Sequence, residues 1–217
     1  MSNPIVEFIK NRTIRRNYIL KLINDEKKGY LYQSGWINSF KQRKPVDRHS
    51  NPIPWLSLPI VHFLQDRLSD DMLVFEYGSG NSTLFFAPQV AKVVSVEHDK
   101  EWYEYLQGQL PSNTSLHFEQ LQPDGSYCRK ASSTGEQYHM IIVDGRDRVN
   151  CCKQAINALA PNGVLLLDDS QREKYQGGLD FMKEQGFKKL DFWGLGPGSI
   201  WNKNTTLFYK ANNCLNI

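Results

Sequence analysis

Hydrophobic positions along the chain follow two different patterns. Residues 4–28 repeat apolar side chains at helical spacing with basic residues between them, which predicts an N-terminal helix. Beyond residue 70, short apolar runs alternate with helical patterns. Strands are expected near residues 72–77, 92–97, 115–120, 139–144 and 163–168, and helices near 82–90, 99–109, 148–160 and 172–185. Apolar strands that alternate with helices predict a mostly parallel sheet with helices on both faces.

The region between the N-terminal helix and the first strand contains several glycines and prolines. This composition predicts a loop over residues 35–54 and a helix over residues 56–68. We therefore divide the chain into an N-terminal basic helix and cap segment, residues 1–54, and a core domain, residues 55–217. Within residues 190–209, two apolar runs flank a glycine-rich turn, which predicts an antiparallel hairpin that closes the sheet.

The clearest chemical signal follows the first predicted strand. Glu76, Gly78 and Gly80 form an E-x-G-x-G sequence where this strand turns into a helix. Glycines in such a turn let backbone N–H groups come close to a ligand. Glu97 follows Gly78 by nineteen residues, at the end of the second predicted strand. A carboxylate at this distance is placed to accept hydrogen bonds from both hydroxyls of a ribose, so the pattern predicts a nucleoside-bearing cofactor.

This arrangement resembles the class I S-adenosylmethionine-dependent methyltransferases over roughly residues 55–210. Besides the E-x-G-x-G turn, the resemblance rests on residues 95–99, 141–146 and 163–170, each of which contains acidic residues. It implies a Rossmann-like α/β fold, with a mostly parallel seven-stranded sheet that ends in a C-terminal antiparallel hairpin, and S-adenosylmethionine as the cofactor. The cofactor contacts that it implies are Glu76, Gly78, Gly80, Asn81, Ser82, Glu97, His98, Gln120 and Asp144.

The end of the fourth predicted strand bears on the methyl acceptor. Asp144 and Gly145 stand where amino-directed nucleic-acid methyltransferases carry Asp/Asn-Pro-Pro-Tyr/Phe. The resemblance therefore disfavours a nucleic acid and implies O-methylation of a small molecule or of a sugar or glycan hydroxyl. Asp144 is the first candidate for the catalytic residue that faces the methyl group, and Asp168 is the second.

The same carboxylates raise the question of a metal ion. Asp144, Asp168 and Asp169 resemble the acids with which some O-methyltransferases hold Mg²⁺, an ion that binds a substrate hydroxyl and eases its deprotonation. Carboxylates at strand ends also cap the helices that follow them, because Asp is a favoured N-cap residue. The sequence leaves both Mg²⁺ and a metal-free site open.

Two other function classes remain as alternatives. A nicotinamide-dependent oxidoreductase uses a similar turn, but its G-x-G-x-x-G sequence requires a third glycine where this chain has Thr83. The alternative from another class is a non-catalytic module that binds a nucleotide or S-adenosylmethionine and associates with a membrane or a partner through the basic N-terminus.

Composition is that of an ordinary soluble protein. Of 217 residues, 40% are hydrophobic and 23% are charged. No run approaches the ~20 apolar residues of a membrane span, and the N-terminus lacks the apolar region of a signal peptide. The four cysteines show no C-x-x-C spacing. We expect a cytoplasmic protein with reduced thiols.

The net charge of +3 conceals an asymmetry. Residues 1–50 carry a net charge of +7, and residues 51–217 carry −4. A basic arm of this kind is suited to contact with an anionic lipid surface, a nucleic acid or an acidic substrate, with residues 4–28 as the contact segment, but a solvated helix face has the same composition. The sequence does not determine the oligomeric state.

Overall fold

A single seven-stranded sheet organises the protein, as the sequence predicts. The structure is a computed structural model that describes residues 4–25 and 28–217. The strands are β1 Leu73–Tyr77, β2 Lys92–Glu97, β3 Thr114–Phe118, β4 Tyr138–Val143, β5 Leu159–Asp168, β6 Lys188–Leu195 and β7 Asn202–Tyr209. They lie in the order β3-β2-β1-β4-β5-β7-β6. The first five are parallel, and β7 is antiparallel to both β5 and β6. The predicted fold class is therefore confirmed.

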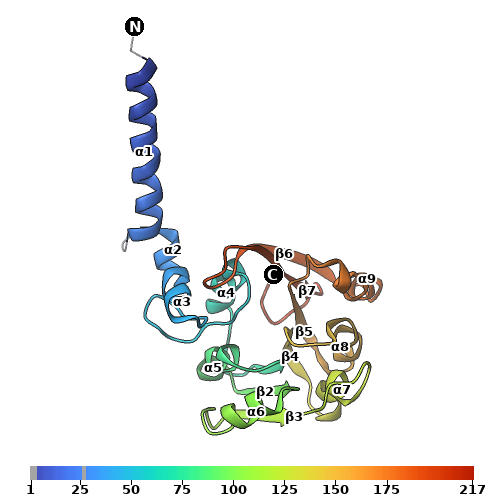
Figure 1. Cartoon of the computed structure of the whole chain (residues 1–217). Coiled ribbons are helices and arrows are strands. Elements are labelled where there is room, and N and C mark those ends of the chain that lie inside the picture. Colours follow the sequence, from blue (N-terminus) through green and yellow to red (C-terminus); the bar gives the residue numbers. More distant parts are fainter. Residues whose placement is uncertain (1–3, 26–27) are drawn as a thin grey trace.

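Helices cover both faces of the sheet. The α-helices are α1 Pro4–Asn24, α2 Tyr30–Gln33, α3 Trp36–Gln42, α4 Leu58–Gln65, α5 Asn81–Phe86, α6 Lys100–Leu106, α7 Ser126–Ser133, α8 Arg148–Ala155 and α9 Gln176–Glu184. Short 3₁₀ turns follow α5 and α8, at Ala87–Gln89 and Ile156–Ala158, and precede α9, at Glu173–Tyr175. Figure 1 shows α4 and α5 on one side of the sheet and α7, α8 and α9 on the other.

The alternation of side chains along the strands explains this layering. Val74 belongs to the apolar cluster that contains the residues of α4 and α5, whereas its neighbour Phe75 belongs to the cluster that contains residues of α7, α8 and α9. Successive strand residues point to opposite faces, so strands that are apolar throughout bury both faces of the sheet. Both residues are fully buried.

Two segments differ from the sequence-based expectation. No helix is predicted between the third and fourth strands, but α7 occupies this connection. Its sequence SYCRKASS buries only Tyr127, Cys128 and Ala131, so its hydrophobic pattern is too short to stand out. The predicted loop over residues 35–54 begins instead with α3, which Trp36 and Phe40 stabilise by stacking one turn apart, with ring centroids 5.4 Å apart.

Helix α1 extends away from the rest of the chain (Figure 1). It ends at Asn24, and residues 26–27 of the predicted helix over residues 4–28 lie outside the described residues. Residues 10–22 are all exposed. No helix in the described part of the chain is both long enough and apolar enough to cross a membrane. The boundary between segments 1–54 and 55–217 stays a prediction.

Candidate functional site

Two adjacent cavities lie at the carboxyl edge of the parallel strands. At the centre of the sheet, the chain leaves β1 toward β2 on one side and leaves β4 toward β5 on the other. Such a switch point leaves a crevice at the strand ends. The larger cavity, here the main pocket, has a volume of about 660 Å³ and lies between the ends of β1, β2 and β4, helix α6 and residues 42–46. The smaller, here the side cleft, has a volume of about 410 Å³ and is lined by Trp55, Asp144, Asp168, Asp169, Gln171, Arg172, Ser199, Trp201, Asn202 and Lys203.

Most of the residues predicted to bind a cofactor come together in the main pocket. Its lining includes Glu76, Gly78, Gly80, Asn81, Ser82, Glu97, His98 and Asp144. Gln120 is exposed after the end of β3 and is not among the described residues that line this pocket. Of the two candidate catalytic residues, Asp144 lines both cavities and Asp168 lines only the side cleft.

Glycine is required at the floor of the main pocket for two reasons. Gly78 has a φ of 98°, a left-handed conformation that strains residues with a side chain. Gly145 follows β4 and permits close packing, because a Cβ atom there would lie 2.0 Å from the hydroxyl of Tyr127 and 3.0 Å from the carbonyl of Tyr77. The ends of β1 and β4 can therefore approach each other beneath the pocket.

The carboxylate of Glu76 is buried at the end of β1. Its Oε2 accepts hydrogen bonds from the hydroxyls of Thr83, at 2.7 Å, and Ser95, at 3.2 Å. Burial raises the pKa of Glu76 to about 7, against these hydrogen bonds. Thr83 occupies the position of the third glycine of a dinucleotide turn, and its hydroxyl also accepts the backbone N–H of Gly80 at 3.1 Å. Thr83 thus joins the buried acid to the glycine turn.

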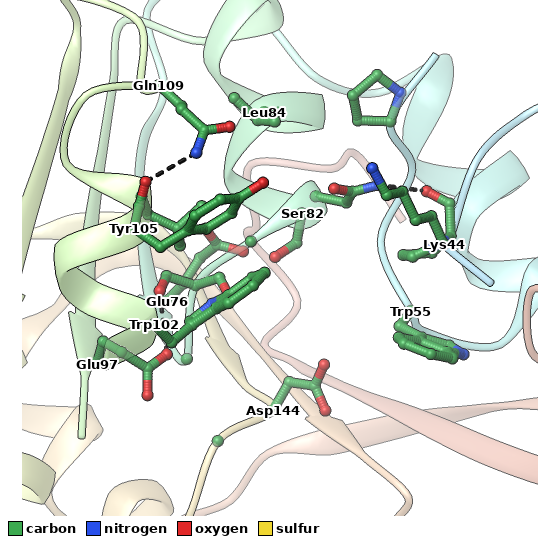
Figure 2. A pocket seen from close by; sticks show the side chains of 18 of the residues that line it. Lys44, Trp55, Glu76, Ser82, Leu84, Glu97, Trp102, Tyr105, Gln109 and Asp144 are labelled. Carbon is green, nitrogen blue, oxygen red and sulfur yellow. Dashed lines mark hydrogen bonds between the residues drawn. The ribbon is translucent and has the colours of Figure 1, made fainter. Parts of the chain in front are cut away.

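Glu97 ends β2 at the wall of the main pocket (Figure 2). Its Oε1 accepts the backbone N–H groups of His98, at 2.7 Å, and Asp99, at 3.0 Å. Its Oε2 accepts the hydroxyl of Ser79 at 3.0 Å. The imidazole Nδ1 of His98 lies 2.8 Å from Oε1. This carboxylate is consequently held in one orientation by the residues that follow it and by the glycine turn.

Helix α6 adds two aromatic side chains that were not among the predicted site residues. Trp102 and Tyr105 line the main pocket, and their rings stack with centroids 5.3 Å apart (Figure 2). The indole N–H of Trp102 donates to the carbonyl of Ser79 at 3.0 Å, which fixes the ring beside the glycine turn. Both rings are exposed on the helix, and their positions in the sequence follow no pattern that marks them as site residues.

The opposite wall comes from the segment that follows α3. Residues 42–46 line the main pocket, and the side-chain amide of Asn81 donates to the carbonyl of Pro45 at 2.7 Å. Ser39 holds the same segment through hydrogen bonds with both backbone groups of Val46. The N-terminal part of the chain therefore contributes to the pocket.

Asp144 stands where the two cavities meet. Figure 2 shows its carboxylate directed into the main pocket. Its Oδ1 accepts a hydrogen bond from Nη2 of Arg148 at 2.9 Å. Desolvation and then the negative charge of Asp168 raise the pKa of Asp144 well above its usual range, although Arg148 and Lys203 oppose the shift. A carboxyl group with a raised pKa is suited to accepting a proton near neutral pH.

The other two acids of the side cleft are paired with cations. Asp168 is buried; its Oδ1 accepts the hydroxyl of Thr205 and its Oδ2 the ammonium of Lys203, both at 2.7 Å. Oδ2 of Asp169 lies 2.8 Å from Nη2 of Arg172. Among the described residues, no group of three or more His, Cys, Asp or Glu side chains is arranged to hold a metal ion. Because each carboxylate already has a cationic partner, these acids do not fit the ligand set that Mg²⁺ requires.

Comparisons with known proteins identify the fold. No protein-family model and no curated protein matches the chain. The structure is similar to a candidate O-methyltransferase from Klebsiella pneumoniae, with 15% identity, a TM-score of 0.53 and coverage of 89% of this chain and 94% of that one. It is also similar to precorrin-6y C5,15-methyltransferase from Geobacter metallireducens, with 12% identity, a TM-score of 0.53 and coverage of 70% and 88%.

A third similar structure is SMU.1697c from Streptococcus mutans, which was solved in complex with SAH (S-adenosylhomocysteine). It has 16% identity, a TM-score of 0.50 and coverage of 70% of this chain and 98% of that one. At these identities the similarity establishes the architecture. The chain has the Rossmann-like fold of the class I S-adenosylmethionine-dependent methyltransferases.

Proposed function

We propose that the protein is an S-adenosylmethionine-dependent methyltransferase that methylates a hydroxyl group of a small molecule or glycan. The observation that carries the proposal is the fixed carboxylate of Glu97, which faces the main pocket one strand away from the glycine turn that contains Gly78. An acid in this place is suited to bind the two hydroxyls of a ribose. The SAH complex of SMU.1697c supports the choice of cofactor, because that protein has the same fold.

The main pocket fits this cofactor in size and chemistry. Its volume of about 660 Å³ lies within the range of small-molecule sites, about 300–1,000 Å³. We assign the ribose to Glu97, the methionine end to the glycine turn and Glu76, and the adenine to the side of the pocket formed by His98 and Trp102. An aromatic ring such as that of Trp102 offers a stacking surface for a base.

Asp144 is the residue that we assign to proton transfer. When bound, S-adenosylmethionine supplies a methyl group on a sulfonium centre. The acceptor oxygen forms a bond to the methyl carbon while the carbon–sulfur bond breaks, and the hydroxyl proton must pass to a base. Arg148 holds Oδ1 of Asp144, so Oδ2 is the oxygen that takes this proton. Asp168 acts as a positioning residue, because both of its carboxylate oxygens already accept hydrogen bonds.

The acceptor is assigned to the side cleft. This cleft shares Trp55 and Asp144 with the main pocket, so a molecule bound there reaches the proposed base. The side chains of Trp55 and Trp201 are exposed at its walls. Aromatic faces of this kind pack against the C–H face of a sugar ring or against a planar acceptor, which is compatible with a small molecule or glycan.

Calorimetric titration with S-adenosylmethionine and with NAD⁺ tests the assignment. We expect binding of S-adenosylmethionine, and a loss of affinity of about 100-fold in Glu97→Ala, since two hydrogen bonds to a charged group are removed. Glu101→Ala is the matched control, because it changes an exposed acid in the first turn of α6, four residues after Glu97. This variant should bind S-adenosylmethionine with wild-type affinity. Tight binding of NAD⁺ without S-adenosylmethionine, or unchanged affinity in Glu97→Ala, would contradict the proposal.

We also propose that α1 contacts an anionic membrane surface. Residues 10–22 contain five basic and no acidic residues, and the exposed side chains of Ile14, Tyr18 and Leu22 recur every four residues along the helix. Basic and apolar side chains on an exposed helix suit binding at a lipid interface. Flotation with phosphatidylglycerol vesicles should recover the full chain and not a variant that lacks residues 1–24. Equal recovery of both proteins would remove the membrane assignment.

A further inference from the structure

The three carboxylates that line the side cleft are matched by three basic side chains, of which Arg172 and Lys203 line the cleft and Arg148 lines the main pocket. Asp144, Asp168 and Asp169 face three basic partners, Arg148, Arg172 and Lys203. Beyond its hydrogen bond to Asp144, Arg148 also places Nη1 3.6 Å from Oδ2 of Asp168 and 3.7 Å from Oδ2 of Asp169. The charges therefore balance without an added ion.

Lys203 occupies the centre of this arrangement because of the sheet topology. Strand β7 runs antiparallel to β5, and Thr205 pairs with Asp168 in register. Lys203 lies two residues earlier on β7 and therefore extends from the same face, past the end of β5. Its ammonium lies 2.7 Å from Oδ2 of Asp168 and 3.6 Å from Oδ1 of Asp169.

Within the part of the chain that the structure describes, the hydrogen bonds of Lys203 leave one donor for a ligand. Its Nζ donates to the carbonyl of Trp55 and to Oδ2 of Asp168, each at 2.7 Å. An ammonium group has three N–H bonds, and 3.6 Å to Asp169 is too long for a third hydrogen bond. Because the residue lines the side cleft and only 13% of its side chain is exposed, the remaining N–H is held at the cleft wall.

We propose that Lys203 takes the place of a divalent metal ion in this carboxylate cluster: its ammonium pairs with Asp168, lies close to Asp169 and offers a donor to the acceptor oxygen beside Asp144. The inference rests on the proposed function for the identity of the acceptor. Its geometry depends only on the described ion pairs. A positive donor next to the acceptor stabilises the negative charge that develops when the hydroxyl loses its proton. Methyl transfer in this site is then independent of added metal.

Titration with Mn²⁺, followed by electron paramagnetic resonance, tests the inference without any acceptor or cofactor. The wild-type protein should leave Mn²⁺ free in solution. Lys203→Met removes the charge and keeps most of the side-chain volume, so the freed carboxylates should bind Mn²⁺ at least about tenfold more tightly. Lys189→Met is the matched control, because Lys189 pairs with Asp191 within β6, and neither residue lines the side cleft. This variant should behave as wild type.

Two results would overturn the inference. The first is one Mn²⁺ bound per wild-type chain and lost in Asp168→Asn, which would mean that the cluster is a metal site. The second is a folded Lys203→Met protein that still binds no Mn²⁺, which would mean that Lys203 does not occupy the ion's position. If Lys203→Met does not fold, Lys203→Gln replaces it with the same expected results. Binding of S-adenosylmethionine to the same samples is measured separately, so a failure of the proposed cofactor is distinguishable from a failure of this inference.

Discussion

The main pocket and the side cleft meet at Asp144, yet they are built in different ways. In the main pocket, the acids are held by residues close to the glycine turn: Glu76 by Thr83, seven residues later, and Glu97 partly by its own successors. In the side cleft, the carboxylate of Asp168 is held by Lys203, thirty-five residues away. Glu76 and Glu97 are thus positioned largely by residues near the glycine turn, whereas Asp168 depends on the position of β7 in the sheet.

If the side cleft depends on long-range ion pairs, removing Arg148 should cause the largest loss of stability. Only 8% of its side chain is exposed, and Arg148→Met leaves buried carboxylates without their partner. We expect a loss of about 3–5 kcal/mol in the free energy of unfolding, measured by urea denaturation. Arg172→Met removes a cation that is 51% exposed and should cost less than about 1 kcal/mol. Equal losses in both variants would mean that burial does not distinguish the two pairs.

Among the acids of the main pocket, Glu76 should contribute most to the pH dependence of stability. Its pKa is raised from 4.5 to about 7, so the folded protein holds a proton that the unfolded chain releases between these values. Stability from this group is present below pH 4.5 and is lost as the pH rises through about 7. At about 1.4 kcal/mol per pKa unit, the loss is about 3–4 kcal/mol.

Glu76→Gln isolates this contribution, because glutamine is uncharged at every pH. Urea denaturation at pH 5 and pH 8 should show a smaller difference in unfolding free energy for the variant than for the wild type. Parallel pH dependences of the two proteins would show that Glu76 does not titrate in this range.

The contrast between the cavities also explains what could be predicted from the sequence. The strands near Glu76, Glu97 and Asp144 were predicted within a few residues, because apolar runs and glycine turns are local signals. The cofactor contacts that the resemblance implied, except Gln120, line the main pocket. The sequence pattern did not name Trp102, since an aromatic residue on an exposed helix face has no special spacing. Lys203 was not identified either, because only the insertion of β7 between β5 and β6 brings it to Asp168.

Asp144 lines both cavities, so its substitution should separate the binding of S-adenosylmethionine from methyl transfer. Asp144→Asn keeps the size of the side chain and removes the proposed base. We expect S-adenosylmethionine to bind with nearly unchanged affinity while methyl transfer slows by about 10²-fold or more. In the wild type, the rate should rise with pH through a midpoint above the usual carboxyl range, because the pKa of Asp144 is raised and only the ionised form accepts a proton.

A comparison of Asp144→Asn with the wild type tests directly whether Asp144 is the base. The rising limb of the pH–rate profile should disappear in Asp144→Asn. A variant that retains both the rate and the pH dependence would show that another group accepts the proton, and Asp144 would then be only a partner of Arg148.

The smallest predicted effect concerns Trp102 and Tyr105 on α6, which the sequence pattern did not identify as site residues. Trp102→Ala removes a ring that lines the main pocket and the hydrogen bond from its indole to the carbonyl of Ser79. Stacking of a base on an aromatic ring is worth about 1–3 kcal/mol, so the dissociation constant for S-adenosylmethionine should rise by about tenfold. Trp193→Ala is the control, because this exposed tryptophan on β6 lines neither cavity among the described residues. Equal affinity in Trp102→Ala and Trp193→Ala would place the adenine away from α6.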